Sequence, residues 1–256
     1  MTTEYYYYGQ GKVWSRRLNV GGGKWRWWGD VSSLTIAMEI EKLEHKESYS
    51  GNKGIARSFP TSKALKLTAT VHQLDTDSLA ETVYGATSAI AAGAVVGEDL
   101  GTVAVGDVLK LDYAGVSALV ITDSTVPTAA TIAAGNYVLD ERFGSLEFTG
   151  LPSSPAPTMP LKAAYSHLAA KQVNFLTQAQ PIVEFRYEGI NLAESNAPQI
   201  VEIYRMGTDP LQELALINND TNLSGAQITM AALIDSTKSA TGALGQFGRI
   251  LQLAAV

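Results

Sequence analysis

The sequence lacks cysteine and long apolar runs and has few charged residues, and each absence removes a class of protein. Without cysteine, its 256 residues can form neither a disulfide framework nor a thiolate metal site. No apolar run reaches the roughly eighteen residues that predict a transmembrane helix, and the start MTTEYYYYGQGK lacks the apolar segment of a secretory signal. With 46% hydrophobic and only 17% charged residues, we expect a soluble globular protein with a sizeable core.

The residue types that usually carry catalysis or bind metals are scattered. His45, His72 and His167 lie in separate segments without the spacing of metal ligands, which predicts exposed strand or loop histidines. The stretch VGGGKW fits neither the phosphate-binding nor the dinucleotide-binding pattern, and no GxSxG motif occurs. Glu39 and Glu41 could form a carboxylate pair, but their spacing is equally typical of the polar face of a strand. We therefore expect no enzyme activity, no cofactor and no metal site.

The charge is divided unevenly along the chain. Residues 1–66 contain 11 Lys and Arg against 6 Asp and Glu, whereas residues 67–256 contain 8 against 19, which together give the net charge of −6. A basic part and an acidic remainder indicate either a nucleic-acid patch or a contact in which the basic region of one copy meets the acidic region of the next. A head-to-tail contact of the second kind builds rings or filaments.

The N-terminal segment is rich in aromatic residues. It contains Tyr5–Tyr8 and every tryptophan of the chain, Trp14, Trp25, Trp27 and Trp28. With its lysines and arginines, this segment fits a platform for single-stranded nucleic acid, because aromatic rings stack on bases while cations neutralise phosphates. An arm whose aromatic residues dock on a neighbouring subunit fits better, because the acidic remainder of the chain would repel a polyanion.

Two segments near the N-terminus alternate apolar and polar residues, as strands with one buried face do. In residues 34–41 the apolar set faces away from Thr35, Glu39 and Glu41, and residues 65–71 repeat the pattern. The two segments predict an antiparallel hairpin joined by a long polar loop at residues 42–64.

Two short helices and further strands are predicted downstream. Residues 75–85 have Ser78 and Glu81 at the spacing of a capping box, with Gly85 as the stop. Residues 211–217, LQELALI, follow Asp209 and a proline at the first helical position. The strands expected in the second half of the chain are 173–176, 183–187, 200–206, 227–234 and 247–253.

The composition between these parts shifts to Ala, Gly, Thr and Val with short strands. Hairpins are predicted at residues 108–112 with 118–122 and at residues 137–140 with 145–149, and the Pro-rich stretch 151–160 resembles a linker. The chain therefore divides into three parts. These are an N-terminal arm with the first half of the main domain (1–85), an inserted β subdomain with its linker (86–160) and the second half of the main domain (161–256).

The order of these features resembles the major tail tube proteins of long-tailed, siphovirus-type bacteriophages. The resemblance covers residues 25–85 and 165–256 and rests on element order and a loose pattern. It is carried by a Trp-rich start, the strand end EIEKLEHKE, the loop SYSGNKG, the helix end VYG, the strand end FRYEGIN and a strand followed by Asp209-Pro210 and LQELALI. The inserted part departs from the minimal pattern of that family.

This resemblance implies a mainly β fold, a β-sandwich or half-barrel flanked by a short helix. It also implies six copies that join their sheets into a ring, and rings that stack into a tube for passage of the genome. The expected partners are other copies of the chain and tape-measure, baseplate and tail terminator proteins. Double-stranded DNA would pass through the lumen without specific binding. The expected location is the virion tail, which is assembled in the bacterial cytoplasm.

In that family the long hairpin loop contacts the adjacent ring. The resemblance therefore assigns residues 42–66, disordered until assembly, to this contact, with Lys46, Tyr49, Lys53, Arg57 and Lys63 as contact residues. Because a DNA channel should repel phosphates, we expect Glu39 and Glu41 to face the lumen. Trp14, Trp25 and Trp27 are the expected contacts of the N-terminal arm.

Two other functions fit the same sequence. A tail terminator or baseplate hub protein would share the tube fold but cap the tube instead of polymerising. A carbohydrate-binding β-sandwich would use the tryptophan cluster as a sugar platform. For the inserted part, the sequence fits decoration of the exterior of a tube, reinforcement of contacts between neighbours or weak adhesion to a cell surface.

Overall fold

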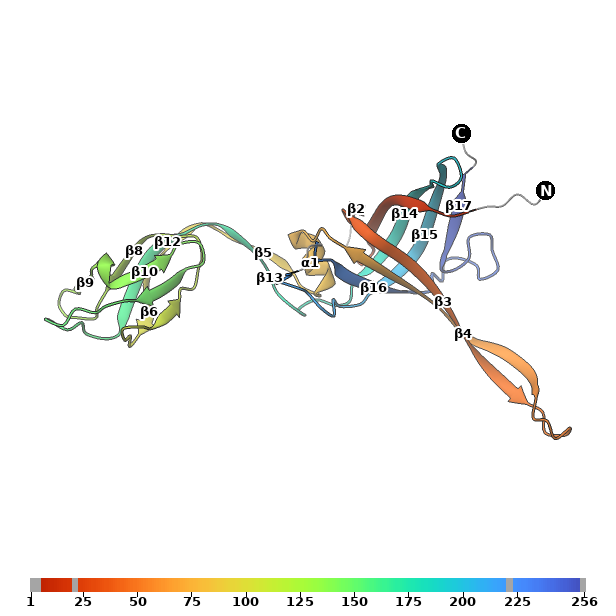
Figure 1. The fold of residues 1–256 in the computed structure, drawn as a ribbon, viewed down its shortest axis with the longest axis horizontal. Helices are drawn as coiled ribbons and strands as arrows, with labels where there is room; N and C mark the ends of the chain where they lie inside the picture. The colour runs from red at the N-terminus through yellow and green to blue at the C-terminus, as the bar shows by residue number, and fades with distance from the viewer. Residues whose placement is uncertain (1–5, 20–22, 220–222, 254–256) are drawn as a thin grey trace. The chain divides into compact units, whose positions relative to one another are not determined.

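The computed structural model describes residues 6–19, 23–219 and 223–253 (Figure 1). Tyr5, Gly21 and Gly22 of the aromatic N-terminal segment lie outside these residues. The predicted mainly β fold with antiparallel sheets and a short helix is confirmed. The chain forms two compact units, residues 1–87 with 173–256 and residues 88–172.

The first unit is built on one eight-stranded sheet with the order β2-β1-β14-β15-β16-β4-β3. Strand β15 pairs with β14 on one side and, over different stretches, with β16 and β17 on the other. The strands are β1 (Gly9–Arg17), β2 (Arg26–Trp27), β3 (Val31–Lys46), β4 (Ile55–Val71), β14 (Ile182–Asn191), β15 (Ala197–Thr208), β16 (Ala226–Ala232) and β17 (Gly248–Gln252).

One face of this sheet forms the core, because its strands alternate apolar and polar residues. Phe185 is fully buried and packs edge-on against Trp28, with 5.9 Å between ring centroids. The buried cluster is Val13, Trp28, Leu67, Ala69, Val71, Val183, Phe185, Ile203, Met206, Ile228 and Met230. The opposite face of the sheet carries the polar residues.

The helix α1 (Thr76–Thr82) lies where it was predicted, but its start differs from the predicted capping box. Asp75 is the N-cap, and its carboxylate accepts a 2.7 Å hydrogen bond from the backbone N–H of Ser78. Glu81 is buried and binds Arg26 of β2 instead of capping the helix. Within the described ranges, no helix combines the length and the apolar character that spanning a membrane requires.

The predicted polar loop 42–64 is wrong, because these residues continue the ladder of β3 and β4. Pairing extends from Val31↔Val71 to Lys46↔Ile55, and only residues 47–54 form the tip. The backbone N–H of Glu47 donates to the Gly54 carbonyl at 2.8 Å, which closes the tip. Both faces of this outer stretch are exposed, so its polar composition carried no information about strand pairing.

The helix predicted at residues 211–217 is also absent. This segment has no regular secondary structure, and Leu216 and Ile217 are both more than four-fifths exposed. A seven-residue helix is too short to be stable unless its apolar face packs on another surface. Among the residues that the structure describes, no surface covers Leu216 and Ile217 in the single subunit.

The second unit packs two sheets around a common core. The sheets have the orders β6-β12-β8-β9 and β10-β11-β7, and Ile121, Leu146, Phe148 and Leu161 are fully buried between them. A separate two-stranded sheet, β13-β5, lies at the ends of this unit. The elements are β5 (Thr87–Ile90), β6 (Gly93–Gly101), β7 (Val108–Lys110), β8 (Val116–Thr122), β9 (Thr131–Ile132), the 3-10 helix η1 (Ala134–Asn136), β10 (Tyr137–Asp140), β11 (Ser145–Phe148), β12 (Leu161–His167) and β13 (Ala170–Val173).

The sequence predicted only some of the strand pairings of this unit correctly. The hairpin of β10 and β11 is confirmed, but the predicted hairpin of 108–112 with 118–122 is wrong, because β7 pairs with β11 and β8 pairs with β12 and β9. The Pro-rich stretch 151–160 is not a linker. Ser124 Oγ donates to the Pro160 carbonyl at 2.6 Å, and β12, which follows the stretch, is a central strand. The unit therefore ends at Gln172 instead of residue 160.

A buried carboxylate connects three segments of the second unit. Asp123 accepts hydrogen bonds from the backbone N–H groups of Ala130 at 2.6 Å, Thr158 at 3.1 Å and Thr125 at 3.2 Å, and also from the Thr125 hydroxyl. The Thr125 hydroxyl and these backbone donors lower the pKa of Asp123 to about 2. The ionised carboxylate therefore holds β8 to the segments on both sides of it.

Because the pKa of Asp123 is lower in the folded than in the unfolded chain, its ionised form stabilises the second unit above about pH 4, and this contribution is lost as the pH falls toward 2. We expect Asp123→Asn to lower the unfolding temperature at neutral pH and to flatten its pH dependence below 4, measured by calorimetry of the full chain. Asp112→Asn, at an exposed position of the same unit, is the control. Equal behaviour of the two variants would contradict the assignment.

Candidate functional site

The histidines and carboxylates do not converge on a centre. The described part of the chain contains no group of three or more His, Cys, Asp or Glu residues that could hold a metal ion. His45 is exposed and His72 half-buried. The prediction of an exposed residue is wrong for His167, which is buried in the second unit and stacks on Tyr113 with 4.0 Å between ring centroids. The features with functional potential are surfaces of the first unit.

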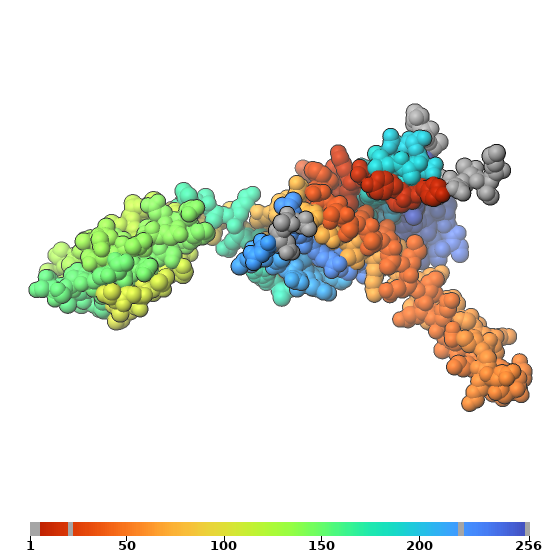
Figure 2. All heavy atoms as spheres, in the orientation of Figure 1, coloured from red at the N-terminus to blue at the C-terminus, as the bar shows by residue number. Residues whose placement is uncertain are grey.

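The first surface is the ribbon, defined as residues 38–65, where β3 and β4 extend beyond the core. Leu34 and Ile36 of β3 pack against the buried cluster, but Met38 and Ile40, which continue the same face, are 73% and 56% exposed. Figures 1 and 2 show the ribbon as a narrow projection from the rest of this unit. The apolar stripe of β3 therefore continues past the surface that could bury it.

The predicted contact residues are all on the ribbon, together with apolar residues that sequence reasoning missed. Lys46, Lys53, Arg57 and Lys63 are exposed, and within the described ranges none of them has an ion-pair partner. Tyr49 is 87% exposed at the tip. The exposed apolar residues that were missed are Met38, Ile40, Leu43, Ile55 and Phe59. Met38 and Ile40 belong to the alternating residues 34–40, whereas Leu43 breaks that alternation just past the register shift at Glu41/Lys42.

The ribbon is a long two-stranded element without a core of its own. A hairpin alone is marginally stable in water, because its backbone hydrogen bonds are exposed and no apolar face is buried. Leu43 and Phe59 are directly opposite each other across the ladder, and both are about half or more exposed. Covering this apolar pair with another surface would be favourable, because it removes their apolar area from water. It would also stabilise the ribbon.

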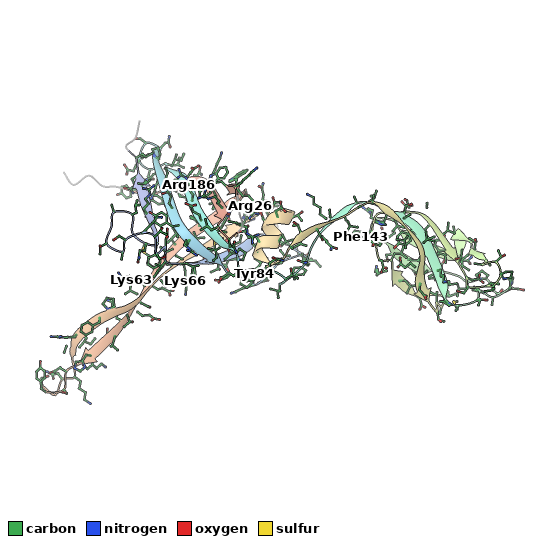
Figure 3. All side chains as sticks on the ribbon, turned by 180° about the vertical axis from the view of Figure 1, so that it is seen from behind. Arg26, Lys63, Lys66, Tyr84, Phe143 and Arg186 are labelled. Atoms are coloured by element: carbon green, nitrogen blue, oxygen red, sulfur yellow. The ribbon has the colours of Figure 1, made fainter. Side chains whose placement is uncertain are left out.

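The second surface is the polar face, the side of the large sheet opposite the core. On this face, five residues that are neighbours across the strand pairings form a row over five strands. They are Trp27, Trp14, Arg186, Glu202 and Arg249. Glu202 lies between two cations, with Arg186 Nη1 2.5 Å from Oε1 and Arg249 Nε 2.6 Å from Oε2 (Arg186 is labelled in Figure 3). The hydrogen bond and the charge of Glu202 raise the pKa of Arg249. This row holds β14, β15 and β17 in register.

Three predicted arm residues, Trp14, Trp25 and Trp27, lie on the same polar face but are not a free arm. Residues 9–17 form β1, which is paired with β14 along its whole length. Trp25 lies 5.1 Å from the guanidinium of Arg16, and Trp27 lies 5.9 Å from the ammonium of Lys12. Trp28, the fourth tryptophan of this segment, belongs to the core.

Glu39 and Glu41 lie on the polar face of β3 and are both exposed. Lys66 Nζ of β4 is 3.2 Å from Glu39 Oε2, and the Ser62 hydroxyl donates to Glu41 at 2.8 Å. Figure 3 shows Lys63 and Lys66 at the base of the ribbon. The two glutamates are therefore accompanied by a cation, so this strip is less acidic than their carboxylates alone imply.

The third surface is the pair of open edges of the sheet. Within residues 6–19, 23–219 and 223–253, no strand pairs with the outer edge of β3, and at the other end of the sheet β2 covers β1 over two residues only. A groove separates β1 from β3, which shows that the sheet curls without closing. Its lining residues include Tyr8, Gly9, Gly11, Val13, Val31, Ser33, Leu34 and Tyr187. These edges present unpaired backbone donors and acceptors.

A comparison with protein families identifies a match. The profile of a family described as protein of unknown function UCP028589 matches residues 6–251. No curated protein matches the chain. The match runs through both units, so the inserted unit is included in it.

The row on the polar face gives a stability prediction. We expect Glu202→Gln to lower the free energy of unfolding by about 2 kcal/mol, because it leaves two arginines facing each other without the carboxylate that both bind. Urea unfolding provides the measurement. The control is Glu188→Gln, which removes a more exposed carboxylate that binds Arg186 alone and should cost below about 1 kcal/mol. A larger loss in the control would contradict the central role of Glu202.

Proposed function

The chain belongs to the family UCP028589, and we propose that it is a structural virion protein that polymerises as stacked rings into the tail tube of a long-tailed bacteriophage. The observation that carries this proposal is the ribbon, an ordered element that exposes Met38, Ile40, Leu43 and Phe59 to water. Soluble monomers rarely expose several large apolar side chains on one projecting element without a partner for them. A second copy of the chain is the partner that the tube resemblance implies.

Lateral contacts between copies follow from the open edges of the sheet. The outer edge of β3 and the sparsely covered edge of β1 are the two ends of one curled sheet. If the β3 edge of one copy pairs with the β1–β2 end of the next, the contact is head-to-tail. Such contacts close into a ring when the rotation between neighbouring copies divides a full turn evenly. Such a closed barrel has no open edges. The number of six copies comes from the resemblance alone.

Contacts between rings are assigned to the ribbon. Its cations Lys46, Lys53, Arg57 and Lys63 match the acidic balance of residues 67–256 in a neighbouring copy. The exposed apolar residues would supply most of the contact energy, and the cations would supply orientation and a faster approach. Because the ribbon is already paired along its length, less ordering entropy is lost on docking than with a disordered loop.

The polar face is assigned to the lumen of the tube. Its charged residues are largely paired with one another, as Glu39 is with Lys66 and Glu202 is with Arg186 and Arg249. A surface of internally paired charges offers few free cations to bind phosphates, so DNA would move along it without specific binding. The expected further partners remain tape-measure, baseplate and tail terminator proteins.

The stacking role of the ribbon is tested by electron microscopy of the purified protein over a concentration series. We expect rings or hollow tubes from the native chain, and from the variant Met38→Ser with Ile40→Ser only monomers or unstacked rings, because both side chains are exposed in the subunit and contribute little to its own stability. Phe143→Ser, at an exposed aromatic residue of the second unit (Figure 3), is the control. Tubes of normal length from the double variant would refute the stacking role.

The lumen assignment is tested by charge reversal. Glu39→Lys with Glu41→Lys should leave tubes that assemble but slow DNA delivery, because the two new lysines would lie with Lys66 on the proposed channel strip without a carboxylate partner. Delivery is measured as the rate of genome release from assembled particles. Glu141→Lys with Glu147→Lys, two exposed positions of the second unit, is the matched control. Unchanged delivery in the first variant would rule out the lumen position.

A further inference from the structure

A cluster of cations on the core side of the sheet takes no part in the proposed tube contacts. A pocket beside α1 is lined by Ser15, Arg17, Gly23, Lys24, Arg26 and Glu81. Ser15 and Arg17 lie on β1 on the side opposite Trp14 and Arg16, and Arg26 of β2 is the cross-strand neighbour of Ser15. The pocket is therefore separated from the polar face by the sheet itself.

The charges in this pocket do not balance. Arg17, Lys24 and Arg26 stand against a single carboxylate, Glu81, which leaves a formal excess of two positive charges. Glu81 is 6% exposed and is already bound to the terminal nitrogen of Arg26. Among the described residues, Arg17 and Lys24 have no carboxylate partner. Neutralising two cations held this close to each other would lower the electrostatic free energy of the folded state.

Several hydrogen-bond donors in the pocket also have no acceptor. The Nε–H groups of Arg17 and Arg26 are buried and unpaired among the described residues. The Ser15 hydroxyl oxygen accepts a 2.8 Å hydrogen bond from the Trp28 indole, which leaves its own proton available for donation. A buried donor without an acceptor costs free energy, so an occupant that accepts from these groups would stabilise the site.

The backbone brings Lys24 to this pocket through a close approach that requires glycine. A β-carbon at Gly23 would lie 2.2 Å from the carbonyl oxygen of Arg17, so a side chain at this position would collide with the backbone of β1. Trp28 orients Ser15, because its buried indole N–H donates to the Ser15 hydroxyl oxygen. The donors are therefore set on paired strands and a tight crossing.

We propose that this pocket binds a dianionic oxyanion of the phosphate class. The formal excess of two charges matches a dianion. The donors of Ser15, Arg17, Lys24 and Arg26 suit the several oxygens of a tetrahedral anion, since arginine and lysine are the usual phosphate ligands of proteins. A single carboxylate brings one charge and two oxygens and would leave part of the pocket unsatisfied. The inference is independent of tube assembly.

Isothermal titration of the full chain with sodium phosphate, at about pH 8 and constant ionic strength, tests the proposal, because the dianion prevails there. One phosphate per chain is expected, with acetate binding at least about tenfold more weakly. No heat with phosphate, or equal affinity for acetate, would overturn the proposal. Glycerol phosphate separates two sources: affinity equal to that of phosphate supports a site for phosphate monoesters, and weaker affinity supports a site for the free ion.

Variants locate the binding. Arg17→Gln and Lys24→Gln should each weaken phosphate binding by about tenfold or more, because each removes a charged donor. Lys24 is exposed, so its variant keeps the fold even if the half-buried Arg17 does not tolerate substitution. Arg16→Gln is the matched control, since Arg16 neighbours Arg17 on β1 but lies on the polar face, bound to Glu184. Equal weakening by Arg16→Gln, or none by Lys24→Gln, would overturn the site.

Discussion

Backbone hydrogen bonding at the ends of one curled sheet constrains the rest of this structure. An eight-stranded sheet that does not close leaves two rows of unpaired N–H and C=O groups, and water or another chain must satisfy them. In this chain the core lies on one side of the sheet and the paired charges on the other, so neither face competes with the edges for a partner. The ribbon extends the open β3 edge outward to Lys46, which adds further unpaired backbone N–H and C=O groups to that edge.

The sequence predicted the elements better than their extent. Alternation located β3, β4 and β14, because each buries one face over part of its length and period two is then visible. It failed at the ribbon, where both faces are exposed and polarity says nothing about pairing, and at residues 211–217, where helical spacing was present without a surface to pack on. In the second unit, the adjacent strands β10 and β11 were found, whereas the pairings of β7 and β8 depend on contacts distant in sequence.

The candidate surfaces were predictable to different degrees. The resemblance to tail tube proteins drew attention to Lys46, Lys53 and Arg57, whereas the apolar residues Leu43, Ile55 and Phe59 near them were missed. The row through Arg186, Glu202 and Arg249 could not be foreseen, because it depends on the register of three strands from separate segments. The same holds for the pocket of Arg17 and Lys24, whose members are close in sequence but converge only because β2 returns along β1.

The continuity of β4 has a mechanical consequence. This strand runs from Ile55 at the tip to Val71 in the core, and at about 3.3 Å per residue its length is about 55 Å. Its inner end is clamped between β3 and β16 and buries Leu67 and Ala69 completely. The outer ten residues therefore project about 33 Å from the end of the strand that is fixed in the core. A rotation of only about 5° at the inner end of the strand moves the tip by about 3 Å, roughly one residue of strand register, so small packing changes inside the core are amplified at the tip.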